Sequence, residues 1–128
     1  PPERIKNMIK GKKNISLVSN PDDDEMFKLI REAHLNILVT FQATGLKLKL
    51  LNVLYQGRFC LVNDKMLTGT GLDKLCIIGN DAAALKSHLA RLFDTEFSTK
   101  DIAIREKVLL KLYSNSINAD NLINLVWK

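Results

Sequence analysis

Two lysines stand at the start of a predicted helix, where a helix least favours positive charge. Thr44 is a good N-cap residue and Gly57 a good helix stop, so the pattern predicts a helix over residues 45–56. Lys47 and Lys49 then lie in or near its first turn, where the helix dipole disfavours each cation by about 0.3–1 kcal/mol. Neither this helix nor the apolar run after it contains an Asp or Glu to offset them.

A helix start of this kind is suited to binding a phosphate group. Its first backbone N–H groups have no partner within the helix, the glycine allows close approach, and the two lysines add positive charge. The alternative is a buried amphipathic helix whose lysines extend into water. The residues alone leave both interpretations open.

Composition limits the class of protein. The chain has 128 residues, 46% of them hydrophobic, and a net charge of +5, which suits one soluble domain and an anionic ligand. Its basic residues are scattered, with one cluster at Lys10, Lys12 and Lys13, so we expect no nucleic-acid partner. No apolar run reaches membrane-spanning length and no signal peptide is recognised, so we expect no transmembrane segment and a cytoplasmic location.

The residues that commonly bind metals show no metal-binding spacing. Cys60 and Cys76 each lie inside an apolar strand-like run, which predicts reduced core thiols of a cytosolic protein. His34 and His88 are isolated. The acidic run at residues 22–24 is explained by a helix N-terminus. We therefore expect neither a metal nor a cofactor.

The elements that must position the lysines alternate along the chain. Apolar runs of strand length alternate with helical patterns, which predicts a single α/β domain over residues 1–128 with a parallel sheet. The predicted strands are residues 14–18, 36–41, 59–62 and 75–78. The predicted helices are residues 3–10, a helix that begins in the turn 19–24 and ends near 34, then 45–56, 81–93 (capped by Asn80 or Asp81), 98–113 (capped by Ser98 and Asp101) and 118–127.

Ligands of open parallel sheets bind beyond the carboxyl ends of the strands. Three predicted loops leave such ends, at residues 19–24, 42–46 and 63–72, and all are rich in small or polar residues. The middle loop opens the helix that carries the two lysines. We therefore place the candidate site at these loops.

These residues carry a family likeness. The run from residue 14 to 63 resembles the C-terminal, donor-binding domain of glycosyltransferases built from two Rossmann-like domains, the GT-B class, family 4-like. That family's pattern is G-x-K-x-K-L-L-E-A-L-x-x-G, and this chain reads Gly45-Leu-Lys47-Leu-Lys49-Leu-Leu-Asn52-Val-Leu-Tyr-Gln-Gly57. The resemblance implies a Rossmann-like domain that binds a nucleotide-diphospho-sugar.

The resemblance also implies roles for individual residues. Thr44, Gly45 and Leu46 would donate backbone N–H groups to the donor phosphate, and Lys47 and Lys49 would add charge. Two residues that are two positions apart in a helix differ by about 200° around its axis. Lys47 and Lys49 therefore do not share a face of the predicted helix.

Two further parts of the donor site follow from the same resemblance. The loop of Ser19, Asn20 and Pro21 would lie against the nucleotide base, although it also suits a helix-capping turn. Lys49 shares a polar face with Asn52, which stands where the family has the glutamate that usually binds the donor ribose. Asn52 could hydrogen-bond a ribose hydroxyl, but unlike that glutamate it carries no charge. No catalytic residue is assigned.

The chain departs from the family upstream. Two strand–helix units and the N-terminal acceptor-binding domain are missing, so the chain resembles an enzyme fragment that we expect to be inactive alone. In the family's strand order, 3-2-1-4-5-6, the Ile15 strand and the Ile37 strand are separated by two absent strands. These strands must pair directly, leave an edge open, or complete the sheet as a homo-oligomer.

The sequence is also compatible in part with two other classes of protein. Residues 17–25 superficially resemble the acidic end of the first strand of a phospho-acceptor receiver domain. A receiver also needs an Asp after its third strand and a Lys after its fifth; here Gln-Ala-Thr-Gly follows Phe41 and Gly-Asn-Asp follows Ile78. A non-catalytic α/β module that binds a nucleotide or a protein partner remains open.

Overall fold

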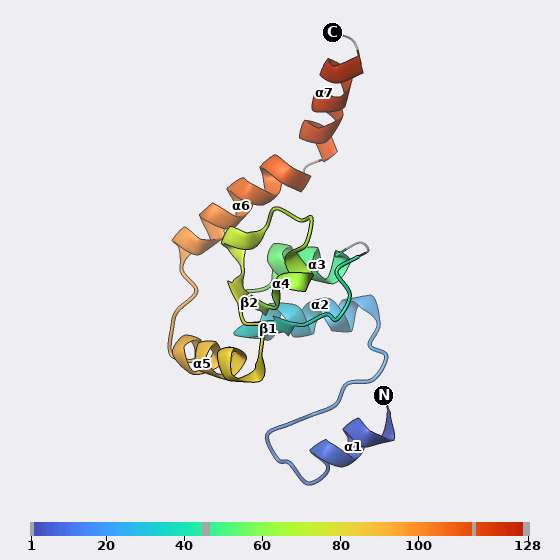
Figure 1. Ribbon diagram of the computed structural model, residues 1–128, viewed down its shortest axis with the longest axis vertical. Coiled ribbons are helices and arrows are strands. Elements are labelled where there is room, and N and C mark those ends of the chain that lie inside the picture. The colour runs from blue at the N-terminus through green and yellow to red at the C-terminus, as the bar shows by residue number, and fades with distance from the viewer. Residues whose placement is uncertain (1, 45–46, 114, 127–128) are drawn as a thin grey trace.

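The computed structural model describes residues 2–44, 47–113 and 115–126, apart from the side chains of residues 115–117 and 121. Its elements are α1 (Glu3–Ile9), α2 (Asp23–Glu32), β1 (Leu35–Leu38), α3 (Leu48–Gln56), β2 (Phe59–Val62), α4 (Asp64–Leu67), the 3-10 turn η1 (Asp73–Leu75), β3 (Ile77–Ile78), α5 (Ala82–Leu92), α6 (Thr99–Tyr113) and α7 (Asn115–Val126). Figure 1 shows the short strands near the centre, with α1 and α7 at opposite ends.

The three strands form one parallel sheet in the order β1-β2-β3. Leu35 pairs with Phe59, and Leu61 pairs with both Ile37 and Ile77. This pairing confirms the α/β class and the parallel sheet. Strand β1 lies at an edge, and no described strand pairs with its outer side.

Helices α2, α3 and α6 build the main core on one face of the sheet. That core contains Cys60 and Val62 of β2, whereas the fully buried Leu61 lies outside it, because side chains alternate along a strand. Leu92 of α5 is also buried and also outside this core, so α5 covers part of the opposite face. The buried members of the main core are Ile30, Leu50, Val53, Leu54, Cys60, Val62, Met66, Leu67, Leu72 and Leu109.

Helix starts are largely where the sequence predicts them. Asp22 and Asp81 each accept a hydrogen bond from the backbone N–H three residues on, at 2.8 and 2.7 Å. At the start of α6 the Asp101 carboxylate accepts hydrogen bonds from the hydroxyl and the backbone N–H of Ser98, at 2.7 and 2.9 Å. The predicted caps at these three helices are confirmed.

Gly57 ends α3, as predicted, because no larger residue fits there. Its N–H donates to the Val53 carbonyl at 2.7 Å. A Cβ atom at position 57 would lie 2.8 Å from both the Asn36 amide nitrogen and the Val53 oxygen. The close approach of α3 to β1, rather than an unusual φ, therefore requires glycine.

The predicted strand over residues 14–18 is wrong. This segment forms no strand and is exposed, with Ile15, Leu17 and Val18 at 42–49% of their full accessibility. A strand needs a neighbour for its backbone hydrogen bonds. Of the three arrangements considered for the sheet, the structure has the one with an open edge.

Several boundaries also differ from the predictions. Strand β1 ends at Leu38 and not at Phe41, and β3 spans only Ile77–Ile78 after the 3-10 turn. The loop predicted over residues 63–72 contains the short helix α4. A short edge strand ends where its pairing with the neighbouring strand ends. The sequence of the edge strand alone does not show where that is.

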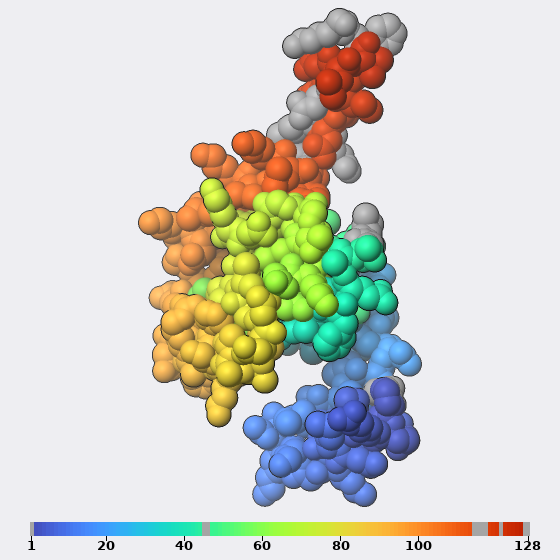
Figure 2. All heavy atoms as spheres, viewed as in Figure 1, coloured from blue at the N-terminus to red at the C-terminus, as the bar shows by residue number. Residues whose placement is uncertain are grey.

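Both ends of the chain project from this core. Figure 2 shows the first residues, in blue, and α7, in red, at opposite ends of the molecule. Residues 2–18, here called the N-terminal arm, are exposed except for the partly buried Ile9. Within the described ranges, no helix combines the length and the apolar character needed to cross a lipid bilayer.

Candidate functional site

Asparagine side chains join the carboxyl ends of the strands, where the candidate site was predicted. Asn63, after β2, donates to the Thr40 carbonyl at 2.7 Å and accepts from the Thr40 N–H at 3.1 Å. Asn80, after β3, accepts from the backbone N–H of Asp64 at 2.9 Å. The loops after all three strands are thus held together at one edge of the sheet.

The start of α3 differs from the prediction. The helix begins at Leu48, and Lys47 occupies the N-cap position without a side-chain cap. Thr44 is therefore not the N-cap, and Gly45 and Leu46 lie outside the described residues. The observed first turn also contains no carboxylate and carries Lys49, so charge does not distinguish the predicted start from the observed one.

The two lysines have different surroundings. Lys47 is partly buried, and its ammonium group donates to the Gln42 carbonyl at 3.2 Å, which holds the loop before α3. Lys49 lies in the first turn of α3 and is exposed. In the part of the chain that the structure describes, the one ion pair joins Lys6 and Glu3, so neither lysine is neutralised by a carboxylate.

The residues predicted to contact the nucleoside lie on two elements. Asn52 is partly buried on α3, one turn after Lys49. Ser19 and Asn20 are exposed in the turn before α2, and Asn20 adopts a positive φ of 51°, which asparagine tolerates better than most residues. Because α2 runs back from the carboxyl edge to the start of β1, this turn and Pro21 lie at the same edge of the sheet as the start of α3.

The predicted site residues line neither of the two hollows found in the described part of the chain. Neither hollow is lined by Lys47, Lys49, Asn52 or the turn at residues 19–21. Of the described residues predicted to bind phosphate and nucleoside, Lys49, Ser19 and Asn20 are exposed at the sheet edge. A ligand there would be bound from one side.

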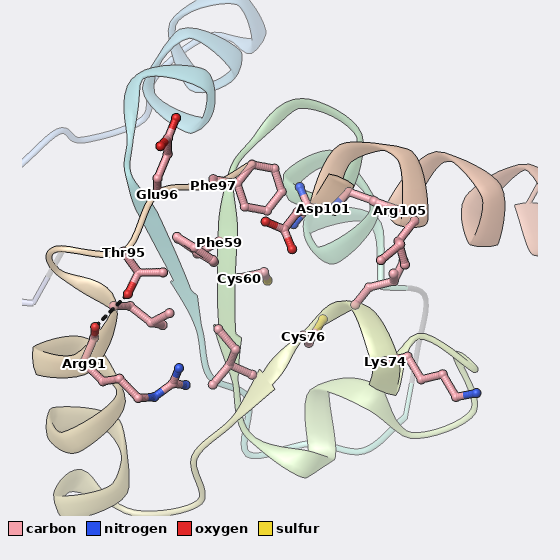
Figure 3. A pocket seen from close by; sticks show the side chains of 14 residues that line it. Phe59, Cys60, Lys74, Cys76, Arg91, Thr95, Glu96, Phe97, Asp101 and Arg105 are labelled. Atoms are coloured by element: carbon pink, nitrogen blue, oxygen red, sulfur yellow. Dashed lines mark hydrogen bonds between the residues drawn. The ribbon is translucent and has the colours of Figure 1, made fainter. Parts of the chain in front are cut away.

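A cavity of about 300 Å³ lies at the opposite, amino end of the sheet (Figure 3). Cys60 and Cys76 stand side by side on its wall, and Arg105 lies next to them. Hydrogen bonding with Cys76, together with burial, raises the pKa of the Cys60 thiol, whereas the hydrogen bond from Cys60 lowers the pKa of Cys76. Both cysteines are free thiols that pack in or against the core, as predicted, with Cys60 buried and Cys76 partly buried.

The charged groups around this cavity do not converge on one point. Figure 3 shows the Lys74 ammonium group pointing away from Cys76, with Arg91 on the other side. Glu96 also points outward. The cavity therefore lacks the clustered polar groups of a catalytic site.

Arg105 is a buried charged residue with a structural role that the sequence did not predict. It is 6% exposed, donates to the Gly57 and Arg58 carbonyls at 2.7 and 2.5 Å, and stacks over the ring of Phe97 at 4.6 Å. Burial lowers its pKa below the ordinary arginine value. The available signal was its spacing between Ile102 and Leu109 on an apolar helix stripe.

The described residues contain no group of three or more His, Cys, Asp or Glu side chains placed to hold a metal ion. The acidic run before α2 serves instead as a helix start, with Asp22 as its N-cap.

Comparison with known proteins gives no relative. No family model, no curated protein and no solved structure matches this chain.

Proposed function

We propose that this chain is the donor-binding part of a GT-B glycosyltransferase and that it binds a nucleotide-diphospho-sugar at the carboxyl edge of its sheet. The strand order supports this. If β1, β2 and β3 correspond to strands 4, 5 and 6 of the order 3-2-1-4-5-6, the open outer side of β1 is where strand 1 would pair. The domain would then be Rossmann-like.

The observation that carries the proposal is the placement of Lys47 and Lys49 at the start of α3. This helix joins two parallel strands, with Leu50 and Leu54 buried and Lys49 in water at the carboxyl edge. Ligands of open parallel sheets bind at that edge. Lys49 would pair with the diphosphate, and Asn52 would hydrogen-bond a ribose hydroxyl.

The turn at residues 19–21 would border the base, and Lys47 would act mainly by holding the loop through Gln42. Acceptor binding and any catalytic base would belong to the acceptor-binding domain. We therefore expect no sugar transfer by these 128 residues alone. Detectable transfer by the isolated chain would contradict this part of the proposal.

Calorimetric titration with UDP, GDP and ADP tests the binding site. We expect one nucleoside diphosphate to bind, and Lys49→Ala to weaken it about tenfold, which corresponds to about 1.4 kcal/mol. Lys107→Ala, an exposed lysine on α6, is the matched control and should leave affinity unchanged. Equal affinities of the Lys49 variant and the parent chain, or no binding of any of the three, would refute the site.

The same preparation tests the receiver alternative. Acetyl phosphate with Mg²⁺ phosphorylates an aspartate of a receiver domain, and intact-mass spectrometry detects the added group. We expect no phosphorylation, because the described chain shows no cluster of carboxylates placed for a metal.

A further inference from the structure

Helix α7 presents an apolar face that its own chain leaves uncovered. Its contacts are mainly with α6, and Figures 1 and 2 show it projecting from the body. Leu122, Leu125 and Val126 are 62%, 81% and 65% exposed. Exposed aliphatic side chains gathered in this way are typical of an interaction surface.

The apolar residues from Ala119 to Val126 share one side of the helix. At 100° per residue, Ala119, Leu122, Ile123 and Val126 lie within one continuous arc. Asp120 and Asn124 lie on the opposite side. The helix therefore has the pattern of an amphipathic helix that docks into an apolar groove.

A groove with matching properties lies between the end of α3 and α6. It has a volume of about 920 Å³. Its walls include Tyr55, Ile102 and Leu110, which are 57%, 44% and 58% exposed. The exposed side chains of Arg31, Arg58 and Glu106 also line it, so charged groups of both signs border the apolar wall.

The chain geometry prevents α7 from filling this groove in its own molecule. Helix α6 ends at Tyr113 and α7 begins at Asn115, so a single residue separates them. Two helices that fold back on each other need a connection of about 2–5 residues. Since α6 itself forms a wall of the groove, its direct continuation cannot turn back into it.

We propose that α7 of one copy binds the α3–α6 groove of a second copy, reciprocally, in a two-fold dimer. Such an interface uses the same two surfaces on both copies and closes without leaving either exposed. This dimer rests on the exposed surfaces alone and does not depend on the proposed function.

The available area is sufficient for association. A helix of 12 residues is about 18 Å long and about 10 Å across, so half its surface is on the order of 300 Å². Two such helices in two grooves bury roughly 1,200 Å², the lower limit of specific interfaces. We therefore expect a reversible dimer whose population depends on concentration.

Sedimentation velocity over a range of concentrations tests the proposal with two variants and their mixture. The α7 variant, Leu122→Glu with Val126→Glu, and the groove variant, Leu110→Glu, change exposed side chains and should each be monomeric. In the mixture, the intact groove of the first variant can bind the intact α7 of the second. We expect the mixture to form a heterodimer that is weaker than the parent dimer.

Other results would overturn the proposal. A parent chain that stays monomeric at every concentration removes it. Dimers of both the α7 variant and the groove variant, or a mixture that associates no more than either variant alone, show that α7 does not bind this groove. Ile37→Glu, at the open edge of the sheet, is the control and should leave the dimer intact. If this variant were monomeric while the α7 and groove variants still formed dimers, association would be assigned to the strand edge instead.

Discussion

At the scale of single residues, Arg105 does most to join separate elements. It lies on α6, but its guanidinium group satisfies the two carbonyls of the turn between α3 and β2. No carboxylate of the described residues pairs with it, so backbone dipoles and the ring of Phe97 stabilise its charge. The residue thus fixes α6 against the sheet.

Replacing Arg105 by methionine should therefore destabilise the fold strongly. The change keeps an apolar stem but leaves the Gly57 and Arg58 carbonyls without their donor, at a cost on the order of 3 kcal/mol. Urea unfolding measures this loss. Lys107→Met, on the same helix but exposed, should change stability by less than about 0.5 kcal/mol. Similar midpoints for both variants would show that Arg105 is not structural.

Asn63 is the second residue with a specific role, because it binds both backbone groups of Thr40. Asn63→Asp keeps the shape but replaces the amide donor by a carboxylate oxygen facing the Thr40 carbonyl. We expect a loss of about 1–3 kcal/mol in the free energy of unfolding. Asn7→Asp, at an exposed position of α1, is the matched control and should have little effect. A loss in both variants would point to a general charge effect.

At the scale of elements, the start of α6 depends on a reciprocal cap. Ser98→Ala removes the hydroxyl that donates to Asp101 and accepts from its backbone N–H, and should cost about 1 kcal/mol. Thermal or urea unfolding measures the change. Ser87→Ala in the middle of α5 should cause no loss, because alanine favours helix there. If both substitutions were neutral, the cap would not stabilise the fold.

The same cap predicts a pH dependence. The hydrogen bond from the Ser98 hydroxyl lowers the pKa of Asp101 below its ordinary value of 3.8. A carboxylate with a lowered pKa stabilises the folded state above the ordinary pKa, and the stabilisation is lost as the pH falls through the folded-state value. The stability difference between the parent chain and Asp101→Asn should therefore be largest near neutral pH and shrink below the ordinary pKa. A difference that is constant with pH would contradict this cause.

Some elements of this chain follow from local sequence signals and others do not. Caps at Asp22, Asp81 and Ser98 were predictable because their hydrogen bonds reach only three residues along the chain. The absence of a strand at residues 14–18 was not predictable from the apolar pattern of this segment. A strand forms only when a neighbouring strand accepts and donates its backbone hydrogen bonds. The predicted start of α3 is too early because Thr44 has a high N-cap propensity, whereas the helix begins at Leu48, after a loop that Lys47 holds through the Gln42 carbonyl.

The candidate site shows the same division between local and long-range information. The sequence placed Lys49 and Asn52 on one helix and the polar loops at one sheet edge, since both follow from the order of elements. It did not indicate that Asn63 would bind Thr40, or that Arg105 would reach the turn after α3. Contacts between residues far apart in the chain depend on how helices pack, and residue types alone do not encode that packing.

At the scale of the whole molecule, the arrangement explains why the N-terminal arm packs on so little. The sheet ends at β1, and the arm crosses no described strand, so its apolar residues Ile15 and Leu17 remain exposed. The central body keeps its core without the arm, because every buried core residue lies between Ile30 and Leu109. Stability should therefore reside in the segment from α2 to α6.

Removal of residues 1–18 tests this division of the molecule. Since residues 2–18 contribute no buried core side chain, the shortened chain should retain its free energy of unfolding within about 1 kcal/mol in dilute solution, where the α7 dimer is not populated. Leu54→Ala, in the fully buried part of α3, should by contrast cost about 2–5 kcal/mol. A loss of that larger size on removing the arm would show that residues 14–18 pair with the outer side of β1 in solution, which would make the open edge a docking place for the chain's own strand.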